Sequence, residues 1–141
     1  MVEKYSQKSW KKIEGMVRIE DETRKRILSL LRDCKNFLSE VKTLLKKAKF
    51  IYFVKETKIK YLFYLIEDSE NNLNSTMEEL SSNFFKGQPL LFIIRVKVNI
   101  SEVERIAVEI IEESDTKCKF LNLLNSIIKN LEEIVRLLDK N

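Results

Sequence analysis

Histidine is absent from this 141-residue chain, which also holds only two cysteines, two glycines and one proline. Without histidine the chain cannot form a Ser-His-Asp or Cys-His nucleophilic system, a histidine-ligated metal site, or the Glu-x-x-His pairs of di-iron bundles. The two glycines lie 72 residues apart, which excludes a glycine-rich phosphate loop. A site made of carboxylates alone stays open, but no spacing points to one. We therefore expect a protein that is not an enzyme and that binds no metal or cofactor.

The scarcity of glycine and proline also limits the number of turns. Domains rich in β-structure need many turns, which favour Gly, Pro, Asn or Asp. This composition favours a few long helices within one domain that covers residues 1–141. No apolar run approaches the roughly 20 residues of a membrane span, and the first residues lack the apolar segment of a secretory signal. These two features predict a cytoplasmic protein without a membrane span.

Cys34 and Cys118 both fall at apolar positions of helical patterns. Two cysteines do not make a disulfide framework, so we expect reduced thiols inside the core. The alternative is a single disulfide that joins the second helix to the last, which requires the two Cα atoms to lie within roughly 7 Å.

The rest of the chain is organised around residues 20–49, whose apolar residues repeat in steps of four and three. The series consists of Ile27, Leu31, Cys34, Leu38, Val41, Leu45 and Ala48. Such spacing places all of these side chains on one face of a helix. Carboxylates in the first turn and lysines in the last turn complement the helix dipole. The pattern predicts a long helix that buries one face.

A second series on the same helix is cationic. It consists of Lys25, Arg32, Lys35, Lys42, Lys46 and Lys49. At 100° per residue these side chains share a sector roughly 120° wide, which is offset from the apolar face. Lys55, Lys58 and Lys60 extend the series if the chain folds back after the helix. We predict that these residues bind a nucleic acid or a protein partner, and the simpler alternative is a solvated helix surface.

Two stretches permit either helix or strand. Residues 50–66 are rich in aromatic and β-branched side chains, which favour strands, yet Ile59, Leu62 and Ile66 continue a helical register. Residues 90–100 alternate apolar and polar side chains as a strand does, and they also fit a helix. A lone strand needs a partner, so both stretches must share one state. We predict helix for both, and the alternative is an α+β fold with a small antiparallel sheet from 50–66 and 90–100.

The predicted fold is all-α, an antiparallel bundle of four to five helices. The expected segments are 4–14, 20–48, 50–85, 89–113 and 116–140. The boundary between the third and fourth is the clearest, because Gly87 and Pro89 follow the usual order of a helix stop and a helix start. The predicted core comprises Ile27, Leu31, Leu38, Val41, Leu45, Leu62, Ile66, Leu73, Leu80, Ile106, Ile110, Leu121, Leu124, Ile128, Leu131 and Val135.

Charge is distributed unevenly along the sequence. Residues 1–60 carry 17 Lys and Arg against 8 Asp and Glu, a net of +9, whereas residues 61–141 carry 9 against 14, a net of −5. Helix faces of opposite charge permit docking on a protein partner or self-association into an oligomer. The first hypothesis is therefore a structural or adaptor subunit that acts through protein–protein contacts.

Two other hypotheses use the basic residues differently. A sequence-independent accessory subunit would bind the DNA or RNA backbone with the basic helix face, while exposed tyrosines stack on bases. A peripheral membrane protein would place residues 50–66, with their lysines and aromatic side chains, on anionic lipids. The membrane hypothesis requires that these aromatic residues lie on the surface.

Overall fold

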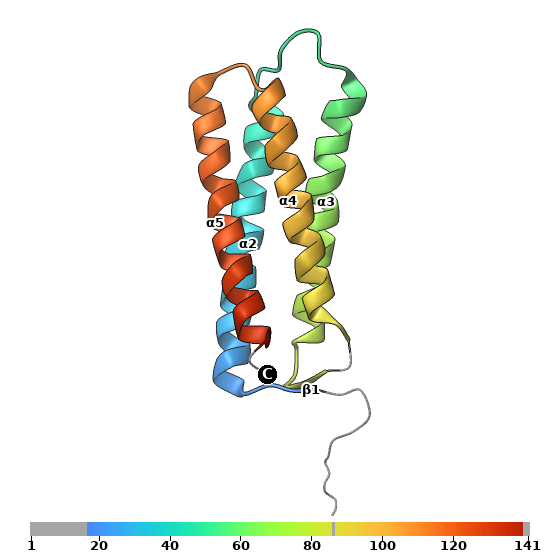
Figure 1. Cartoon of the computed structure of the whole chain (residues 1–141), viewed down its shortest axis with the longest axis vertical. Coiled ribbons are helices and arrows are strands. Elements are labelled where there is room, and N and C mark those ends of the chain that lie inside the picture. Colours follow the sequence, from blue (N-terminus) through green and yellow to red (C-terminus); the bar gives the residue numbers. More distant parts are fainter. Residues whose placement is uncertain (1–16, 86, 140–141) are drawn as a thin grey trace, which may run out of the picture.

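Four long helices account for most of the computed structural model, which describes residues 17–85 and 87–139 (Figure 1). They are α2 (Asp21–Lys47), α3 (Glu56–Glu79), α4 (Pro89–Ile110) and α5 (Ser114–Asp139). Successive helices run in opposite directions along one long axis (Figure 1). The predicted all-α antiparallel bundle is therefore confirmed. The helix expected at 4–14 lies outside the described residues.

The bundle consists of two closely packed antiparallel pairs. Helix α2 packs most extensively against α5, and α3 packs most extensively against α4. Contacts of α2 with α3 and of α4 with α5 join the two pairs around one core. The α2–α3 loop (48–55) and the short α4–α5 connection (111–113) lie at one end, and the α3–α4 connection lies at the other (Figure 1).

Helix α2 follows the predicted pattern closely. Asp21 and Glu22 occupy its first turn and Lys46 and Lys47 its last turn, where each charge complements the helix dipole. Its buried residues are Ile27, Leu30, Leu31, Cys34, Leu38, Val41 and Leu45. The heptad spacing therefore identified the buried face of this 27-residue helix correctly.

Helix α3 is shorter than the predicted 50–85 segment at both ends. Residues 50–55 form a turn instead, because α2 and α3 are antiparallel and the chain must reverse between them. The amide of Ile51 donates to the carbonyl of Ile110 (2.9 Å). Such contacts with the end of α4 satisfy backbone groups that a helix would have paired within itself.

The alternative sheet from 50–66 and 90–100 does not form. The first stretch joins α3 from Glu56 onward, and the second lies wholly within α4. Pro89 starts α4, as the sequence predicts, because the first position of a helix needs no amide hydrogen. The strands in the described residues are β1 (Val17–Arg18) and β2 (Phe84–Phe85), a two-residue antiparallel pairing.

Helix α5 differs from the predicted core by part of a turn. Its buried residues are Phe120, Leu124, Ile127, Leu131 and Ile134. Leu121, Ile128 and Val135 were expected in the core, but each is only half-buried. The observed buried residues and the three expected ones both fit helical spacing. Packing against α2 decides that the observed set faces the core. The other predicted core residues are buried.

Both cysteines are free thiols. Cys34 is buried between α2 and α5, where its sulfur lies 3.9 Å from the carbonyl oxygen of Ile127. Burial raises the pKa of the Cys34 thiol to about 12. The core position expected for Cys118 is wrong, because α5 buries the side of Phe120 and leaves Cys118 exposed.

Candidate interaction site

The nine predicted binding residues all lie at least partly on the surface. Three of them form ion pairs with carboxylates. These pairs are Lys25–Asp21 (3.1 Å), Lys42–Glu70 (3.0 Å) and Lys60–Glu56 (3.4 Å). The other six have no carboxylate within 4.0 Å among the residues that the structure describes. They are Arg32, Lys35, Lys46, Lys49, Lys55 and Lys58.

Lys42 differs from the rest of the cationic series because it joins two helices. Its ammonium lies 3.0 Å from the Glu70 carboxylate of α3, and only 29% and 25% of the two side chains are exposed. Partial burial leaves such a pair less screened by water and salt than an exposed pair. The pair divides the cationic series into two separate groups along α2.

An apolar strip on the outer side of α4 was missed by sequence reasoning. Leu91, Ile94 and Val98, which we call the α4 strip, are exposed to 57%, 45% and 63%. Their spacing of three and four places them in one line along the helix. The opposite side of α4 is buried in the core through residues such as Ile93 and Ile100. Apolar side chains on both sides are typical of a helix whose outer side is covered by a second surface.

The sequence does carry a signal for the α4 strip. Ile94 and Val98 belong to the alternating run that suggested a strand when its period was taken as two. With the helical period, the same residues form a second apolar line beside the buried one. A helical segment with more apolar side chains than one buried face can hold indicates a second contact surface.

Two tyrosines of α3 accompany the α4 strip. The rings of Tyr61 and Tyr64 stack with centroids 6.3 Å apart, and the two residues are 43% and 55% exposed. Tyr61 and Leu65 line a shallow groove together with Ile94 and Val98, and the groove has a volume of about 630 Å³. The α4 strip therefore belongs to a wider apolar surface over α3 and α4.

A polar network between α3 and α4 supports this surface. Oδ2 of Asp68 accepts hydrogen bonds from Asn99 (2.8 Å) and Arg95 (3.1 Å) of α4 and from Asn72 (3.2 Å) of its own helix. Asn72 and Asn99 are each only 8% exposed. Buried amides require partners, so the carboxylate favours one alignment of the two helices.

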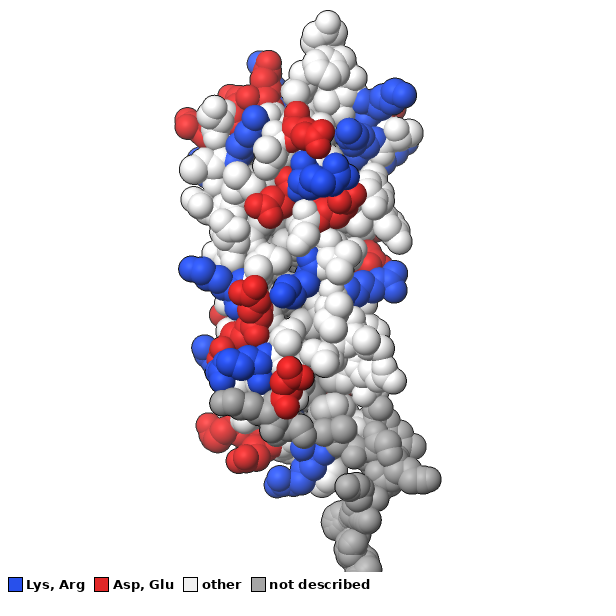
Figure 2. All heavy atoms as spheres, in the orientation of Figure 1, with Lys and Arg blue, Asp and Glu red and all other residues white. Residues whose placement is uncertain are grey.

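Charge on α4 is divided between its two halves. The first eleven residues carry Arg95 and Lys97 and no carboxylate, whereas the last eleven carry three glutamates and Arg105. The Arg105 guanidinium donates to Glu102 (2.8 Å), which lowers the pKa of the Glu102 carboxyl. Figure 2 shows the face of the bundle that α4 and α5 form. Basic and acidic side chains are intermixed over its upper part, and a largely uncharged area lies at the lower right, over the start of α4.

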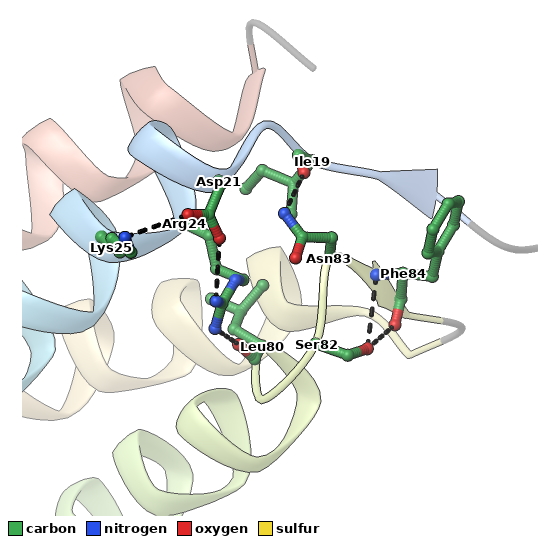
Figure 3. Close-up of polar contacts among 8 residues, drawn as sticks. All are labelled: Ile19, Asp21, Arg24, Lys25, Leu80, Ser82, Asn83 and Phe84. Carbon is green, nitrogen blue, oxygen red and sulfur yellow. Dashed lines mark hydrogen bonds and ion pairs between the residues drawn. The ribbon is translucent and has the colours of Figure 1, made fainter.

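Internal contacts close the end of the bundle that holds β1 and β2 (Figure 3). The amide of Ile19 donates to the carbonyl of Asn83 (2.8 Å), and the side-chain amide of Asn83 donates to the carbonyl of Ile19 (3.0 Å). The Arg24 guanidinium donates to the Leu80 carbonyl (3.3 Å) and to Asp21 (3.0 Å). These hydrogen bonds join the segment before α2 to the segment after α3, which indicates a structural role for this end.

Scans with protein-family models found no matching family, and searches of curated proteins and of solved structures found no similar protein. Within the described part of the chain, no group of three or more His, Cys, Asp or Glu side chains is placed to hold a metal ion. No described helix is both long enough and apolar enough to cross a bilayer. Function must therefore be inferred from the surfaces of the bundle.

Proposed function

We propose that this protein is a non-enzymatic structural or adaptor subunit that acts through protein–protein contacts, with the α4 strip as its contact surface. The observation that carries the proposal is the 45–63% exposure of three aligned apolar side chains on a helix whose other side is buried. Such side chains lose contact with water when a second apolar surface covers them, which favours association. Tyrosine is enriched at protein interfaces, and Tyr61, which stacks on Tyr64, lines the same groove as Ile94 and Val98.

The partner in this proposal is a second copy of the chain, with the two α4 helices packed antiparallel. A twofold axis near Val98 brings Val98 of the two copies together and places Arg95 of one opposite Glu102 of the other. The basic half of each α4 then faces the half that carries three glutamates, whereas parallel packing would bring like charges together. Both copies use the same surface, so the contact closes as a dimer.

Sedimentation equilibrium over a concentration series tests the proposal. Val98→Glu places two carboxylates opposite each other at the axis and leaves the core intact, since Val98 is 63% exposed. We expect the wild-type protein to dimerise and this variant to raise the dimer dissociation constant by about tenfold or more, because an unpaired buried charge is costly.

Val108→Glu is the matched control. Val108 has the same side chain and is 42% exposed on the same helix, but it lies on the side of Lys97, which pairs with Glu132 of α5 (3.8 Å). This variant should dimerise as the wild type does. A wild-type protein that stays monomeric at every concentration contradicts self-association, and equal weakening by both variants contradicts the placement of the interface.

A second candidate function is sequence-independent binding of DNA or RNA by the basic helix face. It is supported by the six exposed or half-exposed cations that lack a carboxylate partner in the described residues, including Lys46 and Lys49 at the end of α2. Fluorescence anisotropy with short labelled oligonucleotides should then show affinity that falls linearly with the logarithm of salt concentration. Lys46→Glu with Lys49→Glu should abolish binding, and Lys129→Glu on α5 is the control. Binding that both variants retain contradicts this candidate.

A further inference from the structure

The α2–α3 loop ends in a tight turn that exposes two neighbouring aromatic side chains. The amide of Val54 donates to the carbonyl of Ile51 (3.0 Å), which places Tyr52 and Phe53 at the corner of the turn. Tyr52 is 97% exposed and Phe53 72%, more than any other large apolar side chain that the structure describes. Turn corners favour Gly, Pro, Asn, Asp or Ser, so turn formation gives no reason for two aromatic residues here.

Neighbouring contacts hold this turn in place. Phe50 and Val54 are partly buried and pack against the core. The amide of Ile51 donates to the last carbonyl of α4 (2.9 Å), and the amide of Glu112 donates to the carbonyl of Lys49 (2.8 Å). The two aromatic side chains therefore project from a backbone that is fixed on both sides of the turn.

Lysines surround the aromatic pair. Lys49 and Lys55 flank the turn and Lys58 lies in the first turn of α3, and these three exposed side chains have no carboxylate within 4.0 Å in the described ranges. The carboxylates at this end of the bundle are Glu56, Glu109, Glu112, Glu113 and Asp115. The α2–α3 loop reaches farther along the long axis than the α4–α5 connection (Figure 1), and the outermost atoms are uncharged (Figure 2). A flat surface approaching this end would meet the aromatic pair before those carboxylates.

We propose that residues 49–55, which we call the tip, dock the protein on the surface of a lipid bilayer that contains anionic lipids. Aromatic side chains partition into the interface between lipid headgroups and acyl chains. Lysines beside them are attracted to the negative potential of anionic headgroups. The convex shape of the tip suits a broad, deformable surface, and the docked protein lies on the bilayer without spanning it.

The arrangement of the two rings favours a bilayer over a nucleic acid. The rings of Tyr52 and Phe53 are 5.8 Å apart and cross at 84°, so they offer no common face on which successive bases stack. Insertion among lipid chains sets no such requirement, because burial of apolar surface is not directional. The tip also lies at the opposite end of the bundle from the start of α4, so the proposal is independent of dimer formation (Figure 1).

Co-sedimentation with vesicles at low salt tests the proposal on the full-length protein. We expect binding to vesicles of phosphatidylcholine with phosphatidylserine, and binding weaker by about tenfold or more to phosphatidylcholine alone. Tyr52→Ser with Phe53→Ser should weaken binding to the anionic vesicles by about tenfold or more. Phe84→Ser is the control, because it removes an aromatic side chain that is 45% exposed at the opposite end of the bundle, and it should bind as the wild type does. Circular dichroism checks that both variants keep their helices.

An environment-sensitive dye gives a second readout at the tip itself. In a Cys118→Ser background, the dye is attached through Phe53→Cys, or through Lys129→Cys as the control. Emission from the dye at position 53 should shift to shorter wavelength when anionic vesicles are added, and emission from position 129 should not change.

Three results would overturn the proposal. The first is no binding of the wild-type protein to anionic vesicles, and the second is equal binding by the tip variant and the wild type. The third is binding to single-stranded oligonucleotides in preference to vesicles that is lost in the tip variant, which would assign the aromatic pair to base stacking.

Discussion

Leu38 lies in the middle of α2 with none of its surface exposed. Replacing it by alanine removes buried methyl groups and leaves a cavity, so Leu38→Ala should lower the free energy of unfolding by about 2–5 kcal/mol. Val108→Ala, at a position that is 42% exposed, should cost less than about 1 kcal/mol. Urea unfolding followed by circular dichroism measures both. A cost under about 1 kcal/mol for Leu38→Ala would mean that the heptad series does not mark the core.

The two cysteines should differ sharply in reactivity. Burial raises the pKa of Cys34 from 9.0 to about 12, whereas Cys118 is exposed. Because the folded state holds the Cys34 proton more tightly than the unfolded state, this group stabilises the fold fully below pH 9.0, and that contribution is lost as pH rises toward about 12. A thiol reagent should modify Cys118 in the native protein at neutral pH and Cys34 only after unfolding. Equal rates for both thiols would contradict the burial of Cys34.

The ion pair of Lys42 shows that a sequence pattern does not predict contacts between side chains of different helices. Helical spacing alone places Lys42 in the cationic series. Its partner Glu70 lies on another helix, 28 residues along the chain, and no periodicity relates the two. The sequence therefore predicts which cations share a face, but the alignment of α2 against α3 decides which of them a carboxylate neutralises.

At the scale of the helices, an amphipathic pattern predicts a helix and its bounds where one side of the helix is apolar and the other side is charged. The sequence predicts α2 well for this reason, with bounds within one residue of those observed. The first half of α4 is apolar on both sides, so residues 90–100 also fit a strand, and the spacing of the α4 strip is not evident from that alternation. Its helical state follows from packing against α3 and α5, which local sequence does not specify.

The α2–α3 loop illustrates how chain reversal overrides local preference. Residues 50–55 were expected in a helix because Ile59, Leu62 and Ile66 later in the same stretch continue a helical register. The antiparallel packing of α2 and α3 requires a turn there, and the turn leaves Tyr52 and Phe53 in solvent. Sequence reasoning placed the lysines of this region correctly on the surface, but the exposure of the two aromatic residues required the fold.

The Asp68 network should contribute to the pairing of α3 with α4. Asp68→Ala removes the acceptor shared by three side chains and leaves the amide of Asn99, which is only 8% exposed, without that acceptor, whereas Asn72 keeps its bond to the backbone carbonyl of residue 68 (2.6 Å). We expect the free energy of unfolding to fall by about 1–3 kcal/mol in urea titrations. Asp33→Ala, at an exposed position of α2, is the control and should change it by about 0.5 kcal/mol or less. Equal costs for both variants would show that the network does not stabilise this pairing.

At the scale of the whole molecule, the uneven charge of the sequence does not produce two charged ends among the residues that the structure describes. The basic first part of the chain includes α2, which runs the length of the bundle beside α5 (Figure 1). Opposite charges therefore lie side by side, and the face over α4 and α5 carries both signs (Figure 2). The α4 strip offers a better-defined contact than the net charge of either half of the sequence.

The two proposed surfaces together make a prediction that neither makes alone. In an antiparallel dimer the two tips point in opposite directions, so one dimer can bridge two vesicles. The wild-type protein should cluster anionic vesicles, which raises their turbidity. Val98→Glu should bind vesicles without clustering them, and Tyr52→Ser with Phe53→Ser should do neither. Clustering by Val98→Glu as strong as that by the wild type would contradict this arrangement.

Cysteine crosslinking determines whether two copies of the chain pair through antiparallel α4 helices about an axis near Val98. In a Cys118→Ser background, Val98→Cys places two thiols opposite each other, and mild oxidation should join them as a disulfide. Val108→Cys places its thiols far apart, because position 108 of one copy lies opposite the start of α4 in the other. We expect a covalent dimer from Val98→Cys and none from Val108→Cys. Equal yields from both variants, or no covalent dimer from Val98→Cys, would contradict it.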